Sequence, residues 1–488
     1  MSGRSVGFVV TFFIPVVLVR LLDQTDFGTY KQIFLIAGTL YVVGQLGMAE
    51  SLFYFLPLSP RQGARFVTNS LLALILGGLG SLVVLELGGG AVSRWLSNGA
   101  LSRYAPAVGV YLVFMQVSAV LEIVMISRKR YAWASCTYVA LDVLRMALLV
   151  VPVLVVRRLE WLLIGAVAFA VVRCATALWY VWREFDGALR PDAALLRRQL
   201  AYAVPFQMSA IVEILQGNLH NYAVSHYFDA ATFAIYSVGC LQIPLVDFVL
   251  NSVSNVMMVR MAEEIRDGRM RAAAAVWRDT TRRLALLFAP LVGLLMVGAD
   301  AIVRLLFTER YAASVPVFMV SSLTVLLATL QVDAVLRVYA QTRLLFALNM
   351  LRLALVLGLI GWLLAAFHLV GAIVVTLLAS AVMKGLGVLR ARSLMGVSLA
   401  EVLPWRNLGA ILGVAVGAAG AAAWVKMLME APPLVELIGI GAVYAAAYAA
   451  GLYAFGLLRQ EERLIVRNWL ARCGIARRGA HAGEVGGR

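Results

Sequence analysis

Four of the basic residues inside the long apolar runs of this sequence are candidates for binding an anion. Arg145 and Arg173 lie near the middle of two runs, and Arg352 and Lys384 lie in two later ones. A charged side chain at the centre of a membrane costs about 2.5–3.5 kcal/mol on insertion scales, so such a residue indicates a function. Guanidinium and ammonium groups bind phosphate, and arginine can do so through two parallel hydrogen bonds. We therefore expect these residues to line a cationic cavity that binds an anionic group.

Two further runs carry polar side chains at helical spacing. The polar residues are Ser209, Glu213, Gln216 and His220 in one run, and Asp247, Asn251, Ser254 and Asn255 in the next. Each set falls on one helix face, and a polar face in lipid must meet water, a substrate or a partner helix. One interpretation is a hydrophilic cavity in which Gln216, His220 and Asn251 contact the substrate. The alternative is hydrogen bonding between helices.

Three carboxylates inside apolar runs could bind a coupling ion. Glu213 and Asp247 belong to the two polar faces, and Asp333 lies in a later run. An intramembrane carboxylate is a typical site for Na⁺ or a proton. We expect these three residues to couple transport to one of these ions, and the sequence leaves the choice of ion open.

Local pairing is the alternative interpretation of several of these charges. Asp142 and Arg145 are spaced i,i+3, and Asp333 and Arg337 are spaced i,i+4, so each pair could neutralise itself on one helix face. Lys384 and Arg337 could instead extend their long side chains to the membrane surface.

The remaining reactive residues indicate no catalytic or metal site. The four cysteines, Cys136, Cys174, Cys240 and Cys473, show no metal-ligand spacing, and the four histidines are scattered. We expect no catalytic residue, no bound metal and no cofactor beyond a coupling ion.

Composition shows which solvent surrounds these residues. The chain has 488 residues, of which 62% are hydrophobic and 14% are charged, and its mean hydropathy is +0.88. Soluble domains carry about 25% charged residues, so this chain belongs in lipid. The net charge of +16 comes from basic residues between the apolar runs. It indicates contact with anionic membrane lipids and not with nucleic acid.

About fourteen apolar runs are long enough to span a membrane, which requires roughly 20 residues. They are residues 6–22, 30–48, 66–88, 105–126, 132–156, 161–182, 202–225, 232–257, 281–299, 315–338, 343–364, 369–388, 408–428 and 434–457. No small-residue cleavage site follows the first run, so we expect a retained span and not a removed signal peptide. The chain is expected to be an all-α integral membrane protein.

Charge asymmetry between the connections predicts the orientation. The even-numbered connections and both tails hold about three times as many Lys and Arg residues as the odd-numbered connections. Arg20 and Lys31, at the edges of runs, are counted with the odd-numbered connections. Basic connections remain in the cytoplasm, so both termini are expected there. Glu122 then lies near the cytoplasmic end of its run, where we expect it to anchor the helix at the membrane surface.

The two halves of the chain resemble each other. Three segments match at nearly constant offset: 22–30 with 228–236, 140–148 with 347–355, and 163–166 with 369–372. Such a repeat in the same orientation implies two lobes with a binding site between them, as in transporters.

The repeat predicts the domain organisation. It consists of a six-helix lobe at 1–198, a second six-helix lobe at 199–400, two additional transmembrane helices at 401–458 and a cytoplasmic tail at 459–488.

Residues 17–57 resemble the opening of bacterial polysaccharide-biosynthesis flippases. In that family a first span ends in Arg-Leu-Leu, Phe-Gly-x-Tyr follows an acidic turn, and a second span closes with Leu-Gly, as at 20–22, 27–30 and 46–47 here. The second lobe is similar to the family at 202–205, 233–236, 301–307 and 310–311. The family often carries an arginine after Leu-Gly, where this chain has Glu50, so a phosphate contact from this helix is in doubt.

The resemblance implies a member of the multidrug/oligosaccharidyl-lipid/polysaccharide exporter (MOP) superfamily with a MATE-like fold, and not an enzyme. Such a protein flips an undecaprenyl-pyrophosphate-linked oligosaccharide from the inner to the outer leaflet of the bacterial cytoplasmic membrane. It would work by alternating access around a cationic central cavity, with polysaccharide assembly machinery as a possible partner. A MATE-like drug or ion antiporter and a lipid II flippase are the alternatives. The glycan, the coupling ion and the oligomeric state stay open.

Overall fold

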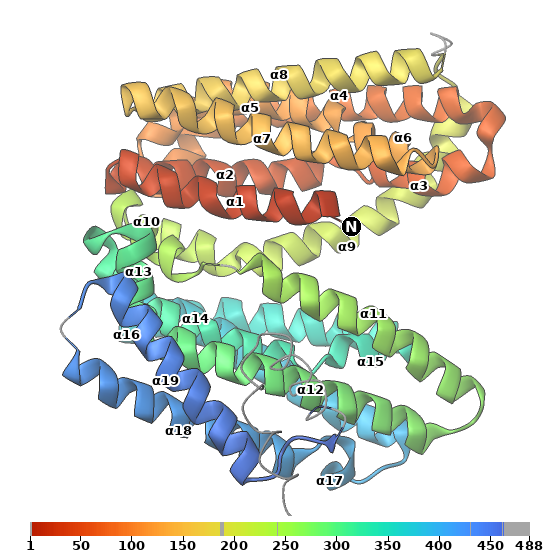
Figure 1. The fold of residues 1–488 in the computed structure, drawn as a ribbon. Helices are drawn as coiled ribbons and strands as arrows, with labels where there is room; N and C mark the ends of the chain where they lie inside the picture. Colours follow the sequence, from red (N-terminus) through yellow and green to blue (C-terminus); the bar gives the residue numbers. More distant parts are fainter. Residues whose placement is uncertain (1, 186–189, 242, 430, 461, 463–488) are drawn as a thin grey trace, which may run out of the picture. The chain divides into compact units, whose positions relative to one another are not determined.

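The computed structural model describes residues 2–185, 190–241, 243–429, 431–460 and 462. Regular secondary structure in this part of the chain is helical throughout (Figure 1). Most of the predicted tail, 459–488, and Cys473 lie outside the described residues.

Most helices of the first half follow the predicted runs, but the helix predicted at 30–48 begins six residues earlier, at Gln24. They are α1 (Ser2–Leu21), α2 (Gln24–Gln45), α3 (Met48–Leu58), η1 (Pro60–Gln62), α4 (Gly63–Trp95), α5 (Ala100–Ser118), α6 (Val120–Ser127), α7 (Tyr131–Val156) and α8 (Leu159–Glu184).

The second half contains the remaining helices. They are α9 (Ala193–Tyr227), α10 (Ala230–Gly239), α11 (Pro244–Arg266), α12 (Met270–Val297), α13 (Ala299–Phe307), η2 (Glu309–Ser314), α14 (Val315–Ala328), α15 (Val332–Val338), α16 (Thr342–Met395), α17 (Leu399–Val402), α18 (Trp405–Leu428) and α19 (Pro433–Ala454).

Eleven helical segments of the described chain are long and apolar enough to cross a membrane. This confirms a multi-pass α-helical membrane protein, whereas the number fourteen stays a prediction. One of the eleven, α16, is two helices that meet at a kink at His368, where φ is 49° and ψ is −136°. The kink falls between the predicted runs 343–364 and 369–388.

Several runs that the sequence predicts as single spans are broken in the structure. Gly47, with φ of 70°, separates α2 from α3. A side chain there would place its Cβ 2.6 Å from the carbonyl oxygen of Ala203. Ala119 separates α5 from α6, and Gln331 adopts a left-handed conformation between α14 and α15. Each break divides a span into two segments that can point in different directions.

The chain divides into two compact units, the first of which comprises 1–251, 303–321 and 346–383. Within it α4 packs on α5, α5 on α8, and α7 on both α1 and α8 (Figure 1). A second core of this unit joins α9, α10, α14 and α16 through Val224, Phe233, Val317 and Val356.

The second unit comprises 252–302, 322–345 and the described residues from 384 onward. Its core lies where α12, α18 and α19 meet, around Ala285, Ile411 and Tyr444. The hydroxyl of Tyr448 donates to the carbonyl oxygen of Leu286 at 3.1 Å, which ties α19 to α12.

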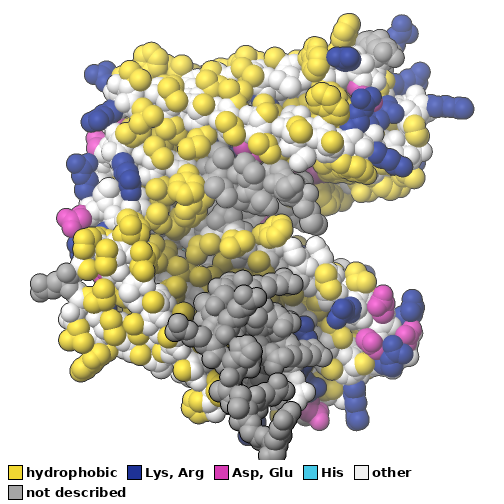
Figure 2. Space-filling view, in the orientation of Figure 1, with side chains coloured by type: hydrophobic (Ala, Val, Ile, Leu, Met, Phe, Trp, Pro, Cys, Tyr) yellow, Lys and Arg dark blue, Asp and Glu magenta, His cyan; other side chains and the backbone are white. Residues whose placement is uncertain are grey.

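Large apolar side chains cover the outside of these helices. Leu87 on α4 is 84% exposed, and Val155 on α7 and Trp362 on α16 are also exposed. Over α1–α8, hydrophobic side chains cover the middle of the helices, and Lys and Arg gather at their two ends (Figure 2). This distribution matches a lipid core between two polar surfaces.

Equivalent aspartates begin α2 and α10. The Asp23 carboxylate accepts from the amide of Asp26 at 2.7 Å, and the Asp229 carboxylate accepts from the amide of Thr232 at 2.9 Å. These aspartates match in the sequence repeat, at an offset of 206 residues. The two helices also pack closely, because a Cβ built on Gly28 would lie 1.8 Å from the carbonyl oxygen of Ala230.

Candidate substrate site

Arg173 on α8 is bound by a carboxylate. Its Nη2 donates to both carboxylate oxygens of Glu122 on α6 at 2.9 Å. Glu122 is 3% exposed, so the expectation that it anchors the helix at the membrane surface is wrong. The physical reason is that α6 packs against α8, which buries the carboxylate and requires a cationic partner.

Lys384 on α16 also meets a carboxylate, in the second unit. Its Nζ lies 3.8 Å from Oδ2 of Asp333 on α15. Arg337 is exposed, and no Asp333–Arg337 ion pair is found within the described chain. The roles of Lys384 in substrate binding and of Asp333 in ion coupling stay predictions.

The two ion pairs share a spacing in the sequence. Glu122 and Asp333 each lie on a short helix after a break, and 211 residues separate Glu122 from Asp333 and Arg173 from Lys384. The sequence repeat has offsets of 206 and 207 residues, so the two pairs do not occupy matching positions of the repeat. The spacing could be read from the sequence, but the pairing could not.

Arg145 on α7 is surrounded differently. Within the described residues it forms no ion pair, not even with Asp142 one turn before it. Its guanidinium is half-buried and lies within electrostatic reach of the hydroxyls of Tyr30 on α2 and Tyr111 on α5. Arg145 therefore lies near tyrosine hydroxyls, and the Asp142 carboxylate is within the same electrostatic reach.

Two residues on the polar face of α9 contact neighbouring helices. Gln216 donates through Nε2 to the carbonyl oxygen of Asn349 on α16 at 2.9 Å. His220 Nδ1 and the Tyr236 hydroxyl of α10 share a hydrogen bond of 2.7 Å. Arg352 of α16 lies within electrostatic reach of His220. The structure thus brings three predicted site residues, Gln216, His220 and Arg352, to one place.

Lys31 on α2 is a basic residue that the sequence predicts at the edge of a connection between spans. The structure places it seven residues inside the helix, half-buried, with its Nζ 5.6 Å from the Phe27 ring centre and 5.8 Å from that of Tyr30. Two such contacts contribute about 0.5–1 kcal/mol each, less than the roughly 2.5–3.5 kcal/mol cost of a charge in the membrane. Asp23 before the helix is the sequence signal that could have revealed the earlier helix start.

These residues form a continuous set within the first unit, which we call the polar row. Its members are Arg145, Tyr30, Lys31, Cys240, Tyr236, His220 and Arg352. Cys240 closes the row, since its thiol hydrogen-bonds with the Tyr236 hydroxyl and lies within electrostatic reach of Lys31. Three cations lie along it with neutral hydrogen-bonding groups between them, which suits an anionic, hydroxyl-rich ligand.

The predicted ion-coupling carboxylates Glu213 on α9 and Asp247 on α11 are exposed, as is the predicted substrate contact Asn251. Within the described residues, no three His, Cys, Asp or Glu side chains come together as a metal site would require. The coupling role of the two carboxylates stays a prediction.

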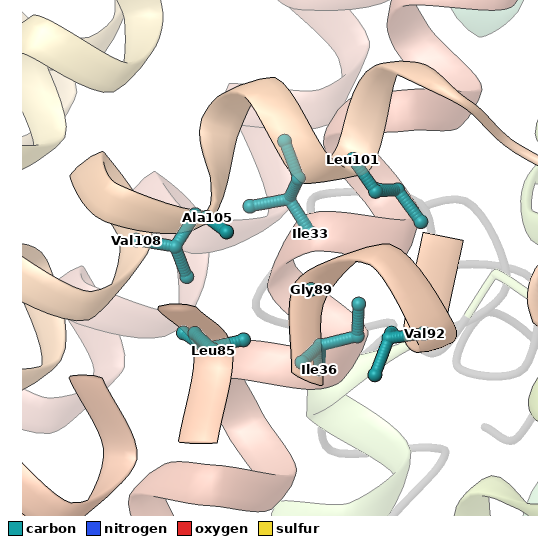
Figure 3. Close-up of a pocket in the computed structure, with 8 residues that line it drawn as sticks. All are labelled: Ile33, Ile36, Leu85, Gly89, Val92, Leu101, Ala105 and Val108. Carbon is teal, nitrogen blue, oxygen red and sulfur yellow. The ribbon is translucent and has the colours of Figure 1, made fainter. Parts of the chain in front are cut away.

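A small pocket of the first unit is apolar and separate from these residues. It lies between α2, α4 and α5, and Figure 3 shows its lining. The lining residues are Ile33, Ile36, Leu85, Gly89, Val92, Leu101, Ala105 and Val108. With no charged or polar side chain, this pocket does not suit a phosphate.

The comparison with known families decides the class of this protein. Residues 17–316, more than half of the chain, match the family described as polysaccharide biosynthesis protein. The chain belongs to this family. No curated protein sequence matches it significantly.

Solved structures of MOP-superfamily transporters share the fold. An inward-facing multidrug-resistance MATE transporter superposes with a TM-score of 0.62 and 12% identity, over 80% of this chain and 96% of that one. The lipid II flippase MurJ, in an inward closed conformation, gives 0.65 and 11%, over 92% and 98%. A MOP-superfamily transporter from Pyrococcus furiosus gives 0.54 and 12%, over 82% and 93%.

Family and fold agree: the chain belongs to a polysaccharide-biosynthesis family and has the fold of MOP-superfamily transporters. The resemblance noted in residues 17–57 is thereby confirmed. A transporter with this fold needs binding groups and no nucleophile, and the polar row offers such groups.

Proposed function

We propose that this transporter flips an undecaprenyl-pyrophosphate-linked oligosaccharide from the inner to the outer leaflet by alternating access. The observation that carries the proposal is the polar row, in which Arg145 and Arg352 lie on membrane-spanning helices and Arg145 forms no ion pair in the described chain. A pyrophosphate would pair with these cations, and the tyrosine, histidine and glutamine groups beside them can bind sugar hydroxyls.

The proposed architecture has fourteen spans in two six-helix lobes, 1–198 and 199–400, followed by two additional helices. An unbroken helix of 54 residues, the length of α16, would be about 80 Å long, whereas a bilayer core is about 30 Å thick. The kink at His368 supports counting α16 as two spans, and α1 and α9 complete the number. Rocking of the lobes would expose the site to each leaflet in turn.

Location and energy source are part of the same proposal. We place the protein in the bacterial inner membrane with both termini in the cytoplasm, where its basic connections contact anionic lipids and polysaccharide assembly proteins can reach it. Glu213, Asp247 and Asp333 are proposed to bind the coupling Na⁺ or proton, and Arg173, Lys384 and Asn251 to add substrate contacts.

Replacing either arginine at the ends of the polar row tests this function. Arg145→Ala and Arg352→Ala, expressed separately in the native host lacking its own copy, should abolish polysaccharide export while membrane levels of the protein stay normal. Arg61→Ala, outside the membrane in η1, is the matched control and should export normally. Normal export by both site variants would remove these arginines from the site.

A lipid II flippase is the second candidate, because the match to MurJ covers 92% of this chain. A drug exporter is favoured less, since the polar row is cationic. The Pyrococcus furiosus transporter is described by a binding pocket of reverse polarity, so this fold accommodates pockets of different charge. Restoration of growth in cells depleted of their lipid II flippase, without any effect on polysaccharide export, would favour the second candidate.

A further inference from the structure

Buried polar side chains join the last turn of α9 to α2 and to the α4–α5 connection. Gln32 on α2 donates through Nε2 to the Ser225 hydroxyl of α9 at 2.7 Å and to the carbonyl oxygen of Leu96 at 3.2 Å. Asn98, between α4 and α5, donates to Oε1 of Gln32 at 2.6 Å. Gln32 and Ser225 are 0% exposed, and Asn98 is 8% exposed. We call Gln32, Asn98 and Ser225 the latch.

Both amide side chains of the latch use all of their hydrogen-bonding groups. An amide side chain has two N–H donors and an acceptor oxygen, and Gln32 uses each of them in the bonds just given. Asn98 also donates to the Thr29 hydroxyl at 2.9 Å and accepts from the amide of Ala100 at 3.0 Å. Such a network fixes one arrangement, because a small displacement leaves buried polar groups without partners.

A second set of hydrogen bonds joins the same elements nearer the surface. The Ser97 hydroxyl donates to the carbonyl oxygen of His226 at 2.7 Å, and Nδ1 of His226 donates to the carbonyl oxygen of Trp95 at 2.6 Å. Together with the latch, these bonds tie α2 and the α4–α5 connection, from the first half of the sequence repeat, to the end of α9, from the second half.

We propose that the latch holds the outer side of the transporter closed and that it breaks in each transport cycle, when the end of α9 leaves α2. This inference rests on the proposed function, in which the two halves rock against each other. Asn98 belongs to an odd-numbered connection, so in the proposed orientation this end of the helices faces the periplasm. Alternating access alone does not say which side chains close the outer side, and the hydrogen bonds assign that role to the latch.

Polar groups suit a contact that must both close and open. When α9 leaves α2, periplasmic water can replace the hydrogen bonds of Gln32 and Ser225, so opening loses little hydrogen bonding. A seam of apolar side chains would instead be exposed to water at every opening, at a cost that grows with its area. The latch therefore specifies the closed arrangement without making it too stable to leave.

Accessibility from outside tests the latch without any substrate. The reporter is Ala234→Cys in a chain whose four natural cysteines are replaced by serine. Ala234 is 0% exposed on α10, one turn from Ala230, whose carbonyl oxygen packs against Gly28 of α2. An impermeant maleimide added to intact cells should label this cysteine when α2 and α10 separate. Gln32→Met weakens only the closed state, so labelling should be at least about tenfold faster, which corresponds to about 1.4 kcal/mol.

Gln116→Met is the matched control. Gln116 is also 0% exposed, but its hydrogen bonds to the carbonyl oxygen of Leu40 and to the Ser81 hydroxyl stay within the first half. Its labelling rate should stay within about twofold of that of the reporter chain. Gln32→Met and Ser225→Ala remove the same hydrogen bond, so the double variant should label no faster than Gln32→Met alone. Additive effects would contradict the latch.

Cross-linking tests whether this contact must open during transport. Ser97→Cys with His226→Cys places two thiols beside the latch, and a short reducible bis-thiosulfonate joins them in cells. Polysaccharide export should stop and should resume after reduction. Tyr104→Cys with Glu160→Cys is the control pair, because these side chains hydrogen-bond at 3.1 Å at the same end of the helices but both belong to the first half. Its cross-link should leave export unchanged.

The outcomes separate this inference from the proposed function. Equal labelling of Gln32→Met and the unchanged reporter chain refutes the latch, whatever the substrate is. Continued export by the cross-linked Ser97→Cys, His226→Cys chain also refutes the latch and leaves the proposed function standing. If host cells export equally with and without the unchanged protein, the proposed function fails, and the labelling rates still decide about the latch.

Discussion

Arg145 and Arg173 lie on helices that pack together, α7 and α8, but their charges are balanced in different ways. Arg173 donates to both oxygens of a buried glutamate, whereas Arg145 faces tyrosines. A buried pair costs desolvation of both ions, so removing one partner is far worse than removing both. The role of each arginine therefore depends on the side chains that surround it.

For the Glu122–Arg173 pair we predict that replacing one residue lowers the stability of the protein and that replacing both does not. Glu122→Gln leaves the Arg173 charge buried beside a neutral amide, which should destabilise the protein by about 3–5 kcal/mol. The double variant Glu122→Leu with Arg173→Met should be close to the unchanged protein in stability. Thermal unfolding in detergent measures both, and a fully stable Glu122→Gln would contradict the prediction. Transport by the stable double variant then decides whether Arg173 also contacts substrate.

At the scale of the element, the starts of α2 and α10 are stabilised by Asp23 and Asp229. Each carboxylate satisfies one of the amide groups that a helix leaves without a partner at its first turn. Hydrogen bonds from the hydroxyl and the amide of Thr232 hold the pKa of Asp229 below its usual value of 3.8. The ionised cap is therefore stabilising at neutral pH.

Asp229→Ala should lower the free energy of unfolding by about 0.5–2 kcal/mol at pH 7. Because the pKa is lowered in the folded protein, the contribution is present above pH 3.8 and is lost as the pH falls through the folded-state value. The difference between the variant and the unchanged protein should therefore shrink at the lowest pH that the detergent complex tolerates. Asp229→Asn, which caps without titrating, is the control, and a pH-independent deficit of the alanine variant would refute the assignment.

The sequence predicts the bounds of a helix where apolar length determines them. It does not predict them where packing against other helices determines them. The run 132–156 corresponds to α7 (Tyr131–Val156) within one residue, because a membrane span needs little beyond its apolar length. The break at Ala119 has neither proline nor glycine to announce it. The Glu122–Arg173 pair joins residues 51 apart, so it depends on how α6 meets α8. Arg145 and Arg352 were recognisable as intramembrane charges, whereas Lys31 was not, since the start of α2 was placed too late.

At the scale of the whole molecule, the distribution of basic residues predicts how the chain sits in the membrane. Arg61 belongs to an even-numbered connection and Arg103 to an odd-numbered one. The excess of arginine in the even connections should hold them on the cytoplasmic side.

We expect Arg103→Cys, in a chain without its natural cysteines, to react with an impermeant maleimide added to intact cells. Arg61→Cys should react only after the cytoplasmic membrane is opened. Mass-tag labelling on gels gives the readout, with a double-permeabilised sample as the positive control. Labelling of Arg61→Cys in intact cells would reverse the proposed orientation.

The aspartate caps of α2 and α10 bear on the ancestry of the chain. An ancestor of half this length could begin such a helix with one aspartate, and a gene duplication that fused two copies would hand the cap down twice. Arg145 and Arg352, which are 207 residues apart, would descend from one residue in the same way. The two halves differ at Lys31, because Ser237 stands at the matching position, 206 residues later. On this account the two copies have diverged there since their fusion, and only one of them carries a cation.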